Sequence, residues 1–312
     1  MRFDALPVER ADTLLAEAIE DFMLHQRACR NSPATLTHYR ESLNKMKDWM
    51  DSNGFASIES IKPASIRAWL SEFAEQTTPR GTPIKPGTVW TAYKNARVFF
   101  NFLESEEMIE VNPIRKVRAP KLDKEILPAF TNEEIQQLET ATSGRDPASL
   151  RNRALIYFLL DSGCRLSETA NLRIQDVDTG SGIVKVIRGK GGKDRITRIG
   201  NVALRALNRY LRVRRSIKSD ALWVGAYGAL TAPGIRIILE RLGKGCGVHC
   251  HAHKFRRTTA LTMLRNGCDV YSIRSLLGHS DLQVLQRYLA QTEQDITLAH
   301  EKHSPLDNRK SR

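Results

Sequence analysis

A basic segment containing prolines divides the chain into two differently patterned stretches, and this division constrains the fold most. Residues 112–125 hold two prolines and five Lys/Arg side chains with little apolar periodicity, which predicts an extended linker. The 312 residues suffice for two globular domains with separate cores. We therefore expect a first domain over residues 1–111, a linker over 112–124 and a second domain over 125–312.

The first stretch has the periodicity of helices, with turn signals between them. Apolar side chains recur at helical spacing over residues 14–23. Ser32 and Pro33 supply an N-cap and a first-turn proline for a second helix. A third helix is expected to begin near Pro63, and a fourth should cover about residues 86–107. Four such helices predict a compact bundle.

The second stretch mixes helical patterns with a hairpin. Thr131 and Glu134 form a capping-box pattern that opens a helix. Further helices are predicted over residues 151–161, 201–215, 231–242, 253–266 and 270–277. Residues 183–188 and 195–199 predict two strands joined by a glycine-rich turn with lysines at its tip. The expected fold class is α+β, mainly helical, with a small antiparallel sheet.

Basic residues concentrate in the second stretch. Residues 1–111 carry 13 Lys/Arg and 16 Asp/Glu, whereas residues 112–312 carry 35 and 19. From Lys185 to Lys218 there are twelve basic residues and one acid, Asp194. This favours a polyanionic partner, which could be nucleic acid, an anionic membrane surface or an acidic protein. Taken alone, such a run is as typical of a solvated helix face.

Several classes of protein are disfavoured by composition. No apolar run approaches the roughly 18 residues that span a bilayer, and the N-terminus lacks the apolar region of a signal peptide, so we expect a cytoplasmic protein without membrane contact. The five cysteines are odd in number and irregularly spaced, which predicts reduced thiols. Cys246, His249, Cys250 and His251 offer zinc-ligand types, but their spacing fits no common zinc finger, so no metal is expected.

Two basic motifs could handle a phosphate. Arg165 follows Gly163 at a predicted helix-to-helix turn, where its planar fork could grip a phosphate, although an ordinary surface arginine after a capping glycine is the commoner case. Lys190 and Lys193 lie in the glycine-rich turn. This turn lacks the Gly-Lys-Ser/Thr ending and does not open a helix, so we expect no ATP site.

Two histidine motifs and a tyrosine follow. His253 and Arg256 lie three residues apart on one helical face, so both could meet one phosphoryl group, while Phe255 should face the core. His279 follows the last predicted helix, and Tyr288 comes nine residues later. A phenol with a pKa of about 10 attacks phosphorus only with a base and cations nearby. Each motif is common by itself.

Taken together, the motifs resemble a known family. The order Gly-x-Arg-x-x-Glu, Gly-Lys-Gly-x-Lys-x-Arg, His-x-x-Arg, Leu-Gly-His-Ser and a tyrosine nine residues later resembles the tyrosine recombinases, which include Xer-type resolvases and phage or transposon integrases. The resemblance is dense in the second domain. The first domain resembles their helical, SAM-like core-binding domain through its architecture and through Ser32, Thr35 and Tyr39.

The resemblance implies six catalytic residues, which are Arg165, Lys190, His253, Arg256, His279 and Tyr288. The two arginines would clamp the nonbridging phosphate oxygens, the lysine would protonate the leaving 5′-oxygen, and the tyrosine would attack. The first histidine would assist proton transfer at the tyrosine, and the second would hydrogen-bond the phosphate. Glu168 matches a family acid that holds the basic residues in place. Cys164 stands where the family usually has leucine or methionine, and Arg257 stands where many members have histidine. Neither position is expected to touch the reacting atoms.

The resemblance also implies how the protein meets DNA. Further DNA contacts are expected from Lys193, Arg195, Arg257, Arg115, Lys116 and Arg118. The reaction would pass through a 3′-phosphotyrosyl intermediate and a Holliday junction, in integration, excision or resolution, without a cofactor. The implied partners are double-stranded DNA carrying a specific site, a homo-tetramer built as a dimer of dimers, and accessory DNA-bending proteins, with the enzyme at the nucleoid.

Two alternative functions share parts of this pattern. A type IB topoisomerase would use similar phosphotyrosine chemistry to relax supercoils as a monomer, but the small helical first domain argues against it. A DNA-binding regulator could keep the fold and lose the chemistry, and the intact set of six catalytic positions argues against that. Formation of a covalent protein–DNA adduct separates the regulator from the enzyme.

Overall fold

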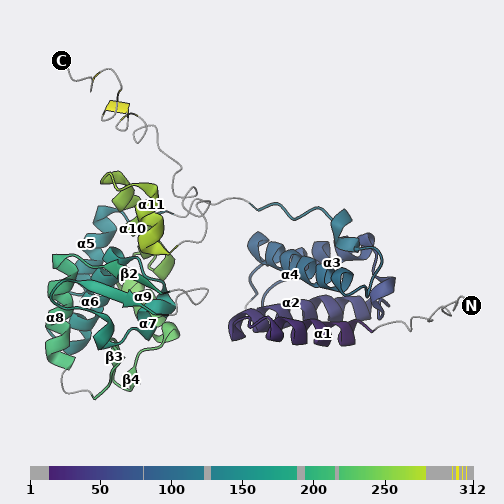
Figure 1. The fold of residues 1–312 in the computed structure, drawn as a ribbon, viewed down its shortest axis with the longest axis horizontal. Helices are drawn as coiled ribbons and strands as arrows, with labels where there is room; N and C mark the ends of the chain where they lie inside the picture. Colours follow the sequence, from purple (N-terminus) through teal and green to yellow (C-terminus); the bar gives the residue numbers. More distant parts are fainter. Residues whose placement is uncertain are drawn as a thin grey trace, which may run out of the picture. The chain divides into compact units, whose positions relative to one another are not determined.

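The computed structural model describes two compact units, which divide between Glu125 and Ile126 (Figure 1). The described residues are 14–79, 81–122, 128–187, 194–214 and 218–278, with Thr297, His300, Glu301, Ser304 and Asp307. Each unit has its own apolar core. Three of the expected catalytic residues, Lys190, His279 and Tyr288, lie outside the described residues, and so does Lys193, an expected DNA contact.

The first unit contains the predicted bundle of four helices. These are α1 (Leu15–Ala28), α2 (Pro33–Ser52), α3 (Pro63–Glu75) and α4 (Pro86–Ser105), with a 3-10 turn, η1 (Ile58–Ser60). Ser32 caps α2 as expected, because its Oγ accepts a hydrogen bond from the Thr35 N–H at 3.2 Å. Phe22 lies at the centre, where its ring packs edge-on against Phe99 and Phe102 at centroid distances of 5.6 and 5.5 Å.

The structure differs from the predicted linker at the start of that segment. Pro113–Lys116 form a 3-10 turn, η2, rather than extended chain. Ile114 and Val117 are buried in the first core, and the Tyr93 hydroxyl donates to the Val117 carbonyl at 3.2 Å. Ile114 and Val117 alone give too little apolar periodicity in this short basic segment to predict their packing against the first core. The basic side chains between and after them, on Arg115, Lys116 and Arg118, are exposed.

The second unit is mainly helical with two small antiparallel sheets. Its helices are α5 (Asn132–Ala141), α6 (Pro147–Ser162), α7 (Leu166–Asn171), η3 (Ile174–Asp176), α8 (Asn201–Val213), α9 (Ala232–Cys246), α10 (Ala252–Arg265) and α11 (Val270–Leu277). Its strands are β1 (Ile183–Val186), β2 (Arg195–Arg198), β3 (Val224–Gly225) and β4 (Gly228–Ala229). Helix α6 packs against both α8 and α10, so it is the central helix of this unit.

The predicted hairpin of β1 and β2 is confirmed, and its register sets which side chains face inward. Val184 pairs with Thr197 and Val186 pairs with Arg195, and the first three of these are buried. Side chains alternate between the two faces of a strand. Arg195 therefore lies on the inner face of β2, next to buried apolar residues.

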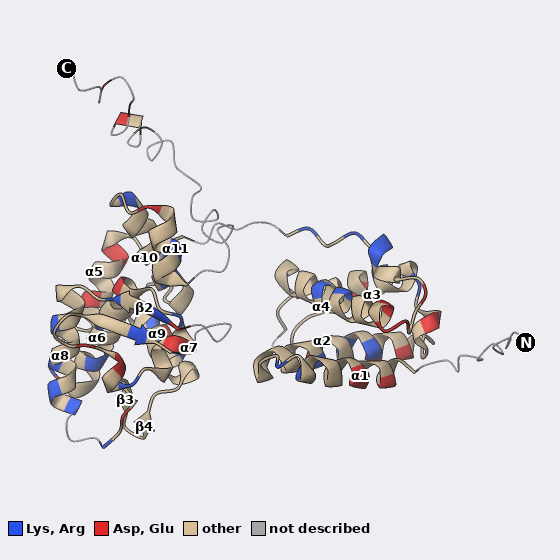
Figure 2. Ribbon diagram, viewed as in Figure 1, with Lys and Arg blue, Asp and Glu red and all other residues tan. Residues whose placement is uncertain are grey.

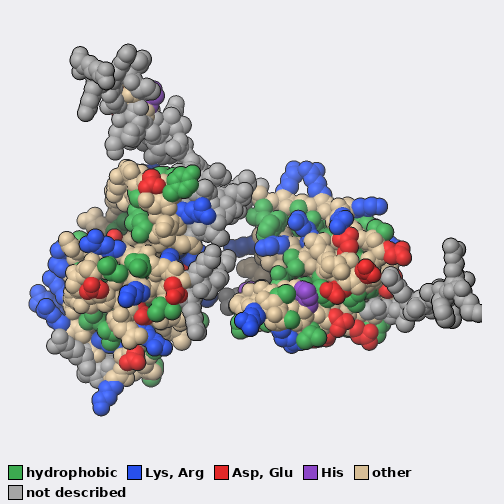
Figure 3. All heavy atoms as spheres, viewed as in Figure 1, with side chains coloured by type: hydrophobic (Ala, Val, Ile, Leu, Met, Phe, Trp, Pro, Cys, Tyr) green, Lys and Arg blue, Asp and Glu red, His purple; other side chains and the backbone are tan. Residues whose placement is uncertain are grey.

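The long basic run is divided between different environments. Arg205, Arg209 and Arg212 are exposed along α8, where the ribbon in Figure 2 is blue at several basic positions. Arg214, in contrast, is 5% exposed and donates to the carbonyls of Ser219 and Ala221. Part of the run is thus the solvated helix face that was the alternative interpretation. Charged and apolar side chains intermingle on the visible face of each unit (Figure 3), and no described helix is long and apolar enough to cross a membrane.

Candidate active site

The turn between α6 and α7 positions Arg165. Gly163 ends α6 in the left-handed region at φ +57°, and a Cβ there would collide with the Leu277 side chain, so only glycine fits. Arg165 then begins α7, and its backbone N–H donates to Glu168 Oε2 at 2.8 Å. The Gly-x-Arg-x-x-Glu pattern is therefore a helix end followed by a helix start. The arginine side chain stays partly exposed at this corner.

The buried carboxylate of Glu168 binds two arginines, Arg165 and Arg195. Its side chain is 4% exposed and accepts from Arg165 Nη1 at 2.8 Å and from both terminal nitrogens of Arg195 at 2.8 Å each. Burial alone would raise the pKa of this carboxyl, but hydrogen bonds from Arg195 and Arg165 lower the pKa to about 2. The carboxylate is therefore ionised at neutral pH and holds both guanidinium groups in place.

Arg256 reaches the same corner from α10. Phe255 faces the core, as expected, with no exposed surface. Arg256 is 3% exposed, and it donates to the Gly163 carbonyl at 2.7 Å and to the Leu277 carbonyl at 2.6 Å. The guanidinium thus joins the end of α6 to the end of α11. Both of these acceptors are main-chain carbonyls, so the two hydrogen bonds tie the guanidinium to two helix termini.

Three arginines donate to successive carbonyls at the C-terminal end of α11. Arg195 Nε donates to Leu276 at 3.1 Å, Arg256 to Leu277 at 2.6 Å, and Arg165 Nη2 to Gly278 at 3.0 Å. The last carbonyls of a helix have no partner within it and carry partial negative charge, so cations are favoured there. The expected catalytic residue His279 is next in the chain.

His253 lies in the first turn of α10, at the surface, with Arg256 one helical turn further on. Partial burial lowers the pKa of the imidazole, and the positive charges of Arg256, Arg257 and Arg165 lower it further. The free protein therefore holds this histidine neutral at pH 7. A neutral imidazole has the lone pair that a proton acceptor needs.

Helix α10 is anchored to the beginning of the second unit. Lys254 is 4% exposed and forms an ion pair with Glu134 at 2.6 Å, with its Nζ 4.4 Å from the centroid of the Phe130 ring. The Phe130 N–H donates to the Thr258 hydroxyl at 2.8 Å. Arg257 Nη1 donates to the Pro128 carbonyl at 3.3 Å. These contacts fix the helix that carries His253 and Arg256.

The structure brings together Arg165, Glu168 and Arg256, and places His253 within electrostatic range of both arginines. Arg195 was expected to contact DNA, but it is turned inward onto Glu168. Sequence reasoning missed Lys254 and its ion pair with Glu134. The capping box did single out Glu134, and the structure confirms that box, with Thr131 N–H donating to Glu134 at 2.9 Å. A partner 120 positions away leaves no local signal.

The cysteine and histidine cluster does not assemble a metal site. Among the described residues, no group of three or more His, Cys, Asp or Glu side chains could hold a metal ion. Burial and the nearby Cys246 raise the pKa of the Cys250 thiol to about 12. The thiol is therefore protonated in the metal-free protein.

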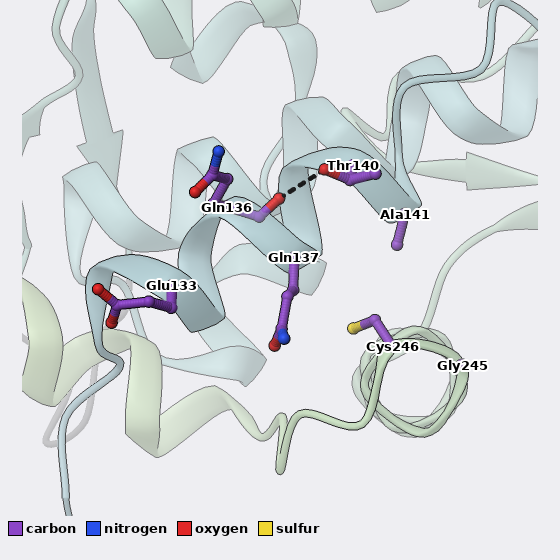
Figure 4. Close-up of a pocket in the computed structure, with 7 residues that line it drawn as sticks. All are labelled: Glu133, Gln136, Gln137, Thr140, Ala141, Gly245 and Cys246. Atoms are coloured by element: carbon purple, nitrogen blue, oxygen red, sulfur yellow. Dashed lines mark hydrogen bonds between the residues drawn. The ribbon is translucent and has the colours of Figure 1, made fainter.

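A groove of about 510 Å³ lies elsewhere on the unit, between α5 and the end of α9 (Figure 4). It is lined by Glu133, Gln136, Gln137, Thr140, Ala141, Gly245 and Cys246. None of the expected catalytic residues lines it. The corner where the arginines meet is consequently the stronger candidate for chemistry, because it holds Arg165 and Arg256.

Comparison with known families and proteins gives a consistent result. Residues 128–295 match the phage integrase family, and residues 19–107 match the phage integrase N-terminal SAM-like domain. The chain is 32% identical over 301 residues to the tyrosine recombinase XerC of Oceanobacillus iheyensis, which covers 93% of this chain and 96% of the relative. It is also 32% identical over 295 residues to XerC of Actinobacillus succinogenes, covering 93% and 97%.

Solved structures resemble the chain over nearly its whole length. The crystal structure of XerA recombinase is 25% identical, with a TM-score of 0.52 over 93% of this chain and 99% of that chain. A structure of the Tn1549 transposon integrase in complex with a circular intermediate DNA has a TM-score of 0.74 at 17% identity, covering 94% of this chain and 100% of that chain. The second likeness concerns the fold.

Proposed function

We propose, because this chain belongs to the phage integrase family of tyrosine recombinases, that it cleaves and rejoins DNA at specific sites through Tyr288. The observation that supports this most is the convergence of Arg165 and Arg256 with the ionised Glu168. Arg256 comes from a distant segment, since the Gly163 carbonyl that it binds lies 93 positions earlier in the chain. Two guanidinium groups at one corner suit the two nonbridging oxygens of a phosphodiester.

In the proposed cleavage step, the Tyr288 hydroxyl oxygen bonds to phosphorus while the bond from phosphorus to the 5′-oxygen breaks. His253, neutral in the free protein, takes up the phenol proton. Lys190 gives a proton to the leaving 5′-oxygen. Arg165 and Arg256 stabilise the charge on the nonbridging oxygens. The DNA is left with a 3′-phosphotyrosyl bond and a free 5′-hydroxyl.

The same residues serve the reverse step. A 5′-hydroxyl from a partner duplex attacks the phosphotyrosyl bond, which retains the energy of the broken phosphodiester, so strands are exchanged without ATP or a cofactor. His279 hydrogen-bonds the phosphate in both directions. One round of exchange gives a Holliday junction, and a second resolves it in integration, excision or resolution.

DNA affinity is proposed to come mainly from basic contacts to phosphates. Candidates are Lys193, Arg257 and the exposed Arg115, Lys116 and Arg118. DNA as partner and oligomerisation are supported by relatives, since a lambda integrase structure is described as a dimer bound to a core site and an XerH structure as bound to difH. We propose a tetramer on DNA, accessory DNA-bending proteins, and a location at the nucleoid in the cytoplasm.

A nicked suicide substrate tests the reaction. The nick lets the short cleaved strand diffuse away, so the covalent intermediate accumulates and migrates as a protein–DNA adduct on a denaturing gel. The wild-type protein should form the adduct in excess chelator, because the positive charge comes from side chains. Tyr288→Phe keeps the ring and removes the attacking oxygen, so it should bind the DNA normally and form no adduct. An adduct in Tyr288→Phe would mean that another residue is the nucleophile, and a wild-type protein that binds its site without any adduct would be a regulator.

A further inference from the structure

We propose that Arg195 is a positioning residue that holds the C-terminal end of α11 against α7, and through it His279, instead of contacting DNA. The inference rests on the proposed function, since the role of His279 belongs to that proposal. Arg195 extends from the inner face of β2, and its side chain is only 11% exposed. A DNA contact would need the guanidinium to face solvent.

The guanidinium of Arg195 donates to Glu168 and to a carbonyl of α11, and Nη2 also lies 3.8 Å from the sulfur of Cys164. Its two terminal nitrogens bind both oxygens of Glu168 at 2.8 Å, and its Nε donates to the Leu276 carbonyl at 3.1 Å. The rigid planar fork makes both contacts with one side chain. A lysine in this place could keep the ion pair, but its single nitrogen could not also reach the carbonyl with the same geometry. The carbonyl contact is therefore specific to arginine.

The backbone of α11 also packs directly on the stem of Arg195. Gly278 has φ +65°, and a Cβ there would lie 2.8 Å from Arg195 Cδ and 3.2 Å from Nε. Two conditions thus require glycine at this position, namely the left-handed backbone and the close approach. The glycine of the Leu-Gly-His-Ser motif is explained by the arginine of the Gly-Lys-Gly-x-Lys-x-Arg motif.

This contact joins the last turn of α11 to the phosphate-binding corner. Glu168 holds Arg195 and Arg165 together, and Arg165 also donates to the Gly278 carbonyl at 3.0 Å. The three carbonyls held by arginines belong to the three residues that precede His279. Losing the Leu276 contact frees the first of them. A displacement of about 1 Å in a catalytic group can cost about 100-fold in rate. We expect cleavage to suffer while DNA binding does not.

Arg195→Lys tests this, with Arg198→Lys as its matched control. Arg198 lies on the same strand, is exposed, and donates to the Ser181 carbonyl, so the same exchange is made outside the corner. With the suicide substrate, Arg195→Lys should cleave at least about tenfold more slowly, with affinity and its salt dependence as in the wild type. Arg198→Lys should cleave at the wild-type rate. Wild-type cleavage by folded Arg195→Lys, or a weaker affinity with a shallower salt dependence, would overturn the proposal.

A double-mutant cycle asks whether Arg195 acts through His279. In a His279→Ala background, Arg195→Lys should cost less than about threefold, because the group it positions is gone. Losses that multiply would mean that Arg195 acts by another route. Hydrogen exchange needs no catalysis, and amides in the last turn of α11 should exchange faster in Arg195→Lys than in Arg198→Lys. If the α11 amides were protected equally in Arg195→Lys and Arg198→Lys, the role of Arg195 would be contradicted, whether or not an adduct formed. If the wild-type protein formed no adduct, only the proposed function would be contradicted.

A charge-neutral pair keeps the test available if Arg195→Lys does not fold. Glu168→Gln combined with Arg195→Gln leaves no buried carboxylate unpaired, and Glu168→Gln alone is its reference. The pair should cleave more slowly than the reference and exchange its α11 amides faster. Equal cleavage and equal exchange in the two proteins would overturn the role of Arg195.

Discussion

Among the described residues, the first unit buries polar side chains only as uncharged groups, such as Asn95 and Asn112, whereas the second buries Glu168, Lys254 and Arg256. A buried charge is costly unless it is paired and hydrogen-bonded. In the second unit each of these charges binds a segment distant in sequence. The first unit is thus held together chiefly by apolar packing, and the second also by charged contacts that assemble its site.

The comparison predicts that removing one buried charge from the second unit lowers both the cleavage rate and the free energy of unfolding. Removing an exposed charge from the first unit should have neither effect. Arg256→Ala should slow cleavage at least about 100-fold. It should also lower the free energy of unfolding by about 1–3 kcal/mol, because two buried carbonyls lose their donor. Cleavage of the suicide substrate and urea denaturation measure the two effects.

Arg40→Ala is the matched control from the first unit. Arg40 forms an ion pair with Glu20 in which both side chains are exposed, and such pairs contribute at most about 1 kcal/mol. Its cleavage rate should equal that of the wild type. If Arg40→Ala destabilised the protein as much as Arg256→Ala, the contrast between the two units would be lost.

The pH dependence of stability sharpens the comparison next. The pKa of Glu168 is about 2 in the folded protein, against 4.5 for a glutamate side chain free in water. A lowered pKa stabilises the fold fully above the unfolded value and loses that contribution as the pH falls from about 4.5 to 2. The contribution at neutral pH is about 3 kcal/mol.

Urea denaturation at several pH values tests this contribution. The wild type should lose stability steeply between pH 4.5 and 2, and Glu168→Gln, which is already less stable at pH 7, should lose less over the same range. Parallel curves for the two proteins would show that Glu168 does not carry the acid dependence.

The sequence predicted those parts of the fold that depend on neighbouring residues. Ser32, the Thr131 and Glu134 capping box, and the glycine ending α6 are all local signals, and the structure confirms them. The hairpin followed from the alternation of its strands. The 3-10 turn at Pro113–Lys116 escaped because its burial depends on a core formed by other helices.

The sequence predicted which residues belong to the site, but it did not predict the contacts that they make. The motifs indicated Arg165, Glu168 and Arg256, but the carbonyls of α11 that they bind cannot be inferred from spacing. Arg195 appeared in the sequence as one more basic residue of a charged hairpin. Its inward position follows from strand register, which places it opposite the buried Val186.

The anchor of α10 gives a smaller expected effect. Glu134→Gln removes the partner of the buried Lys254, and the loss of one buried ion pair that is partly open to solvent should cost about 2 kcal/mol of unfolding free energy. Cleavage should slow only modestly, because Phe130 still ties α10 through Thr258. Glu133→Gln, at the neighbouring exposed position in the same helix turn, should cost less than about 1 kcal/mol. Equal stability of the two variants would show that Lys254 finds another partner.

The smallest expected effect concerns the protonation of His253. In the free protein, burial and the charges of Arg256, Arg257 and Arg165 hold the pKa of the imidazole below its usual value of 6.5. A DNA phosphate at the corner would bring negative charge close to the ring, so binding should raise that pKa again. Histidine NMR signals followed through a pH titration report both states, with Tyr288→Phe used on DNA to prevent cleavage. His300, which has no part in the proposed chemistry, provides the comparison within the same protein. If the pKa of His253 were already near 6.5 in the free protein, or stayed the same on DNA, the imidazole would not lie in the field of these arginines and the phosphate, and its role as the proton acceptor would have to be given up.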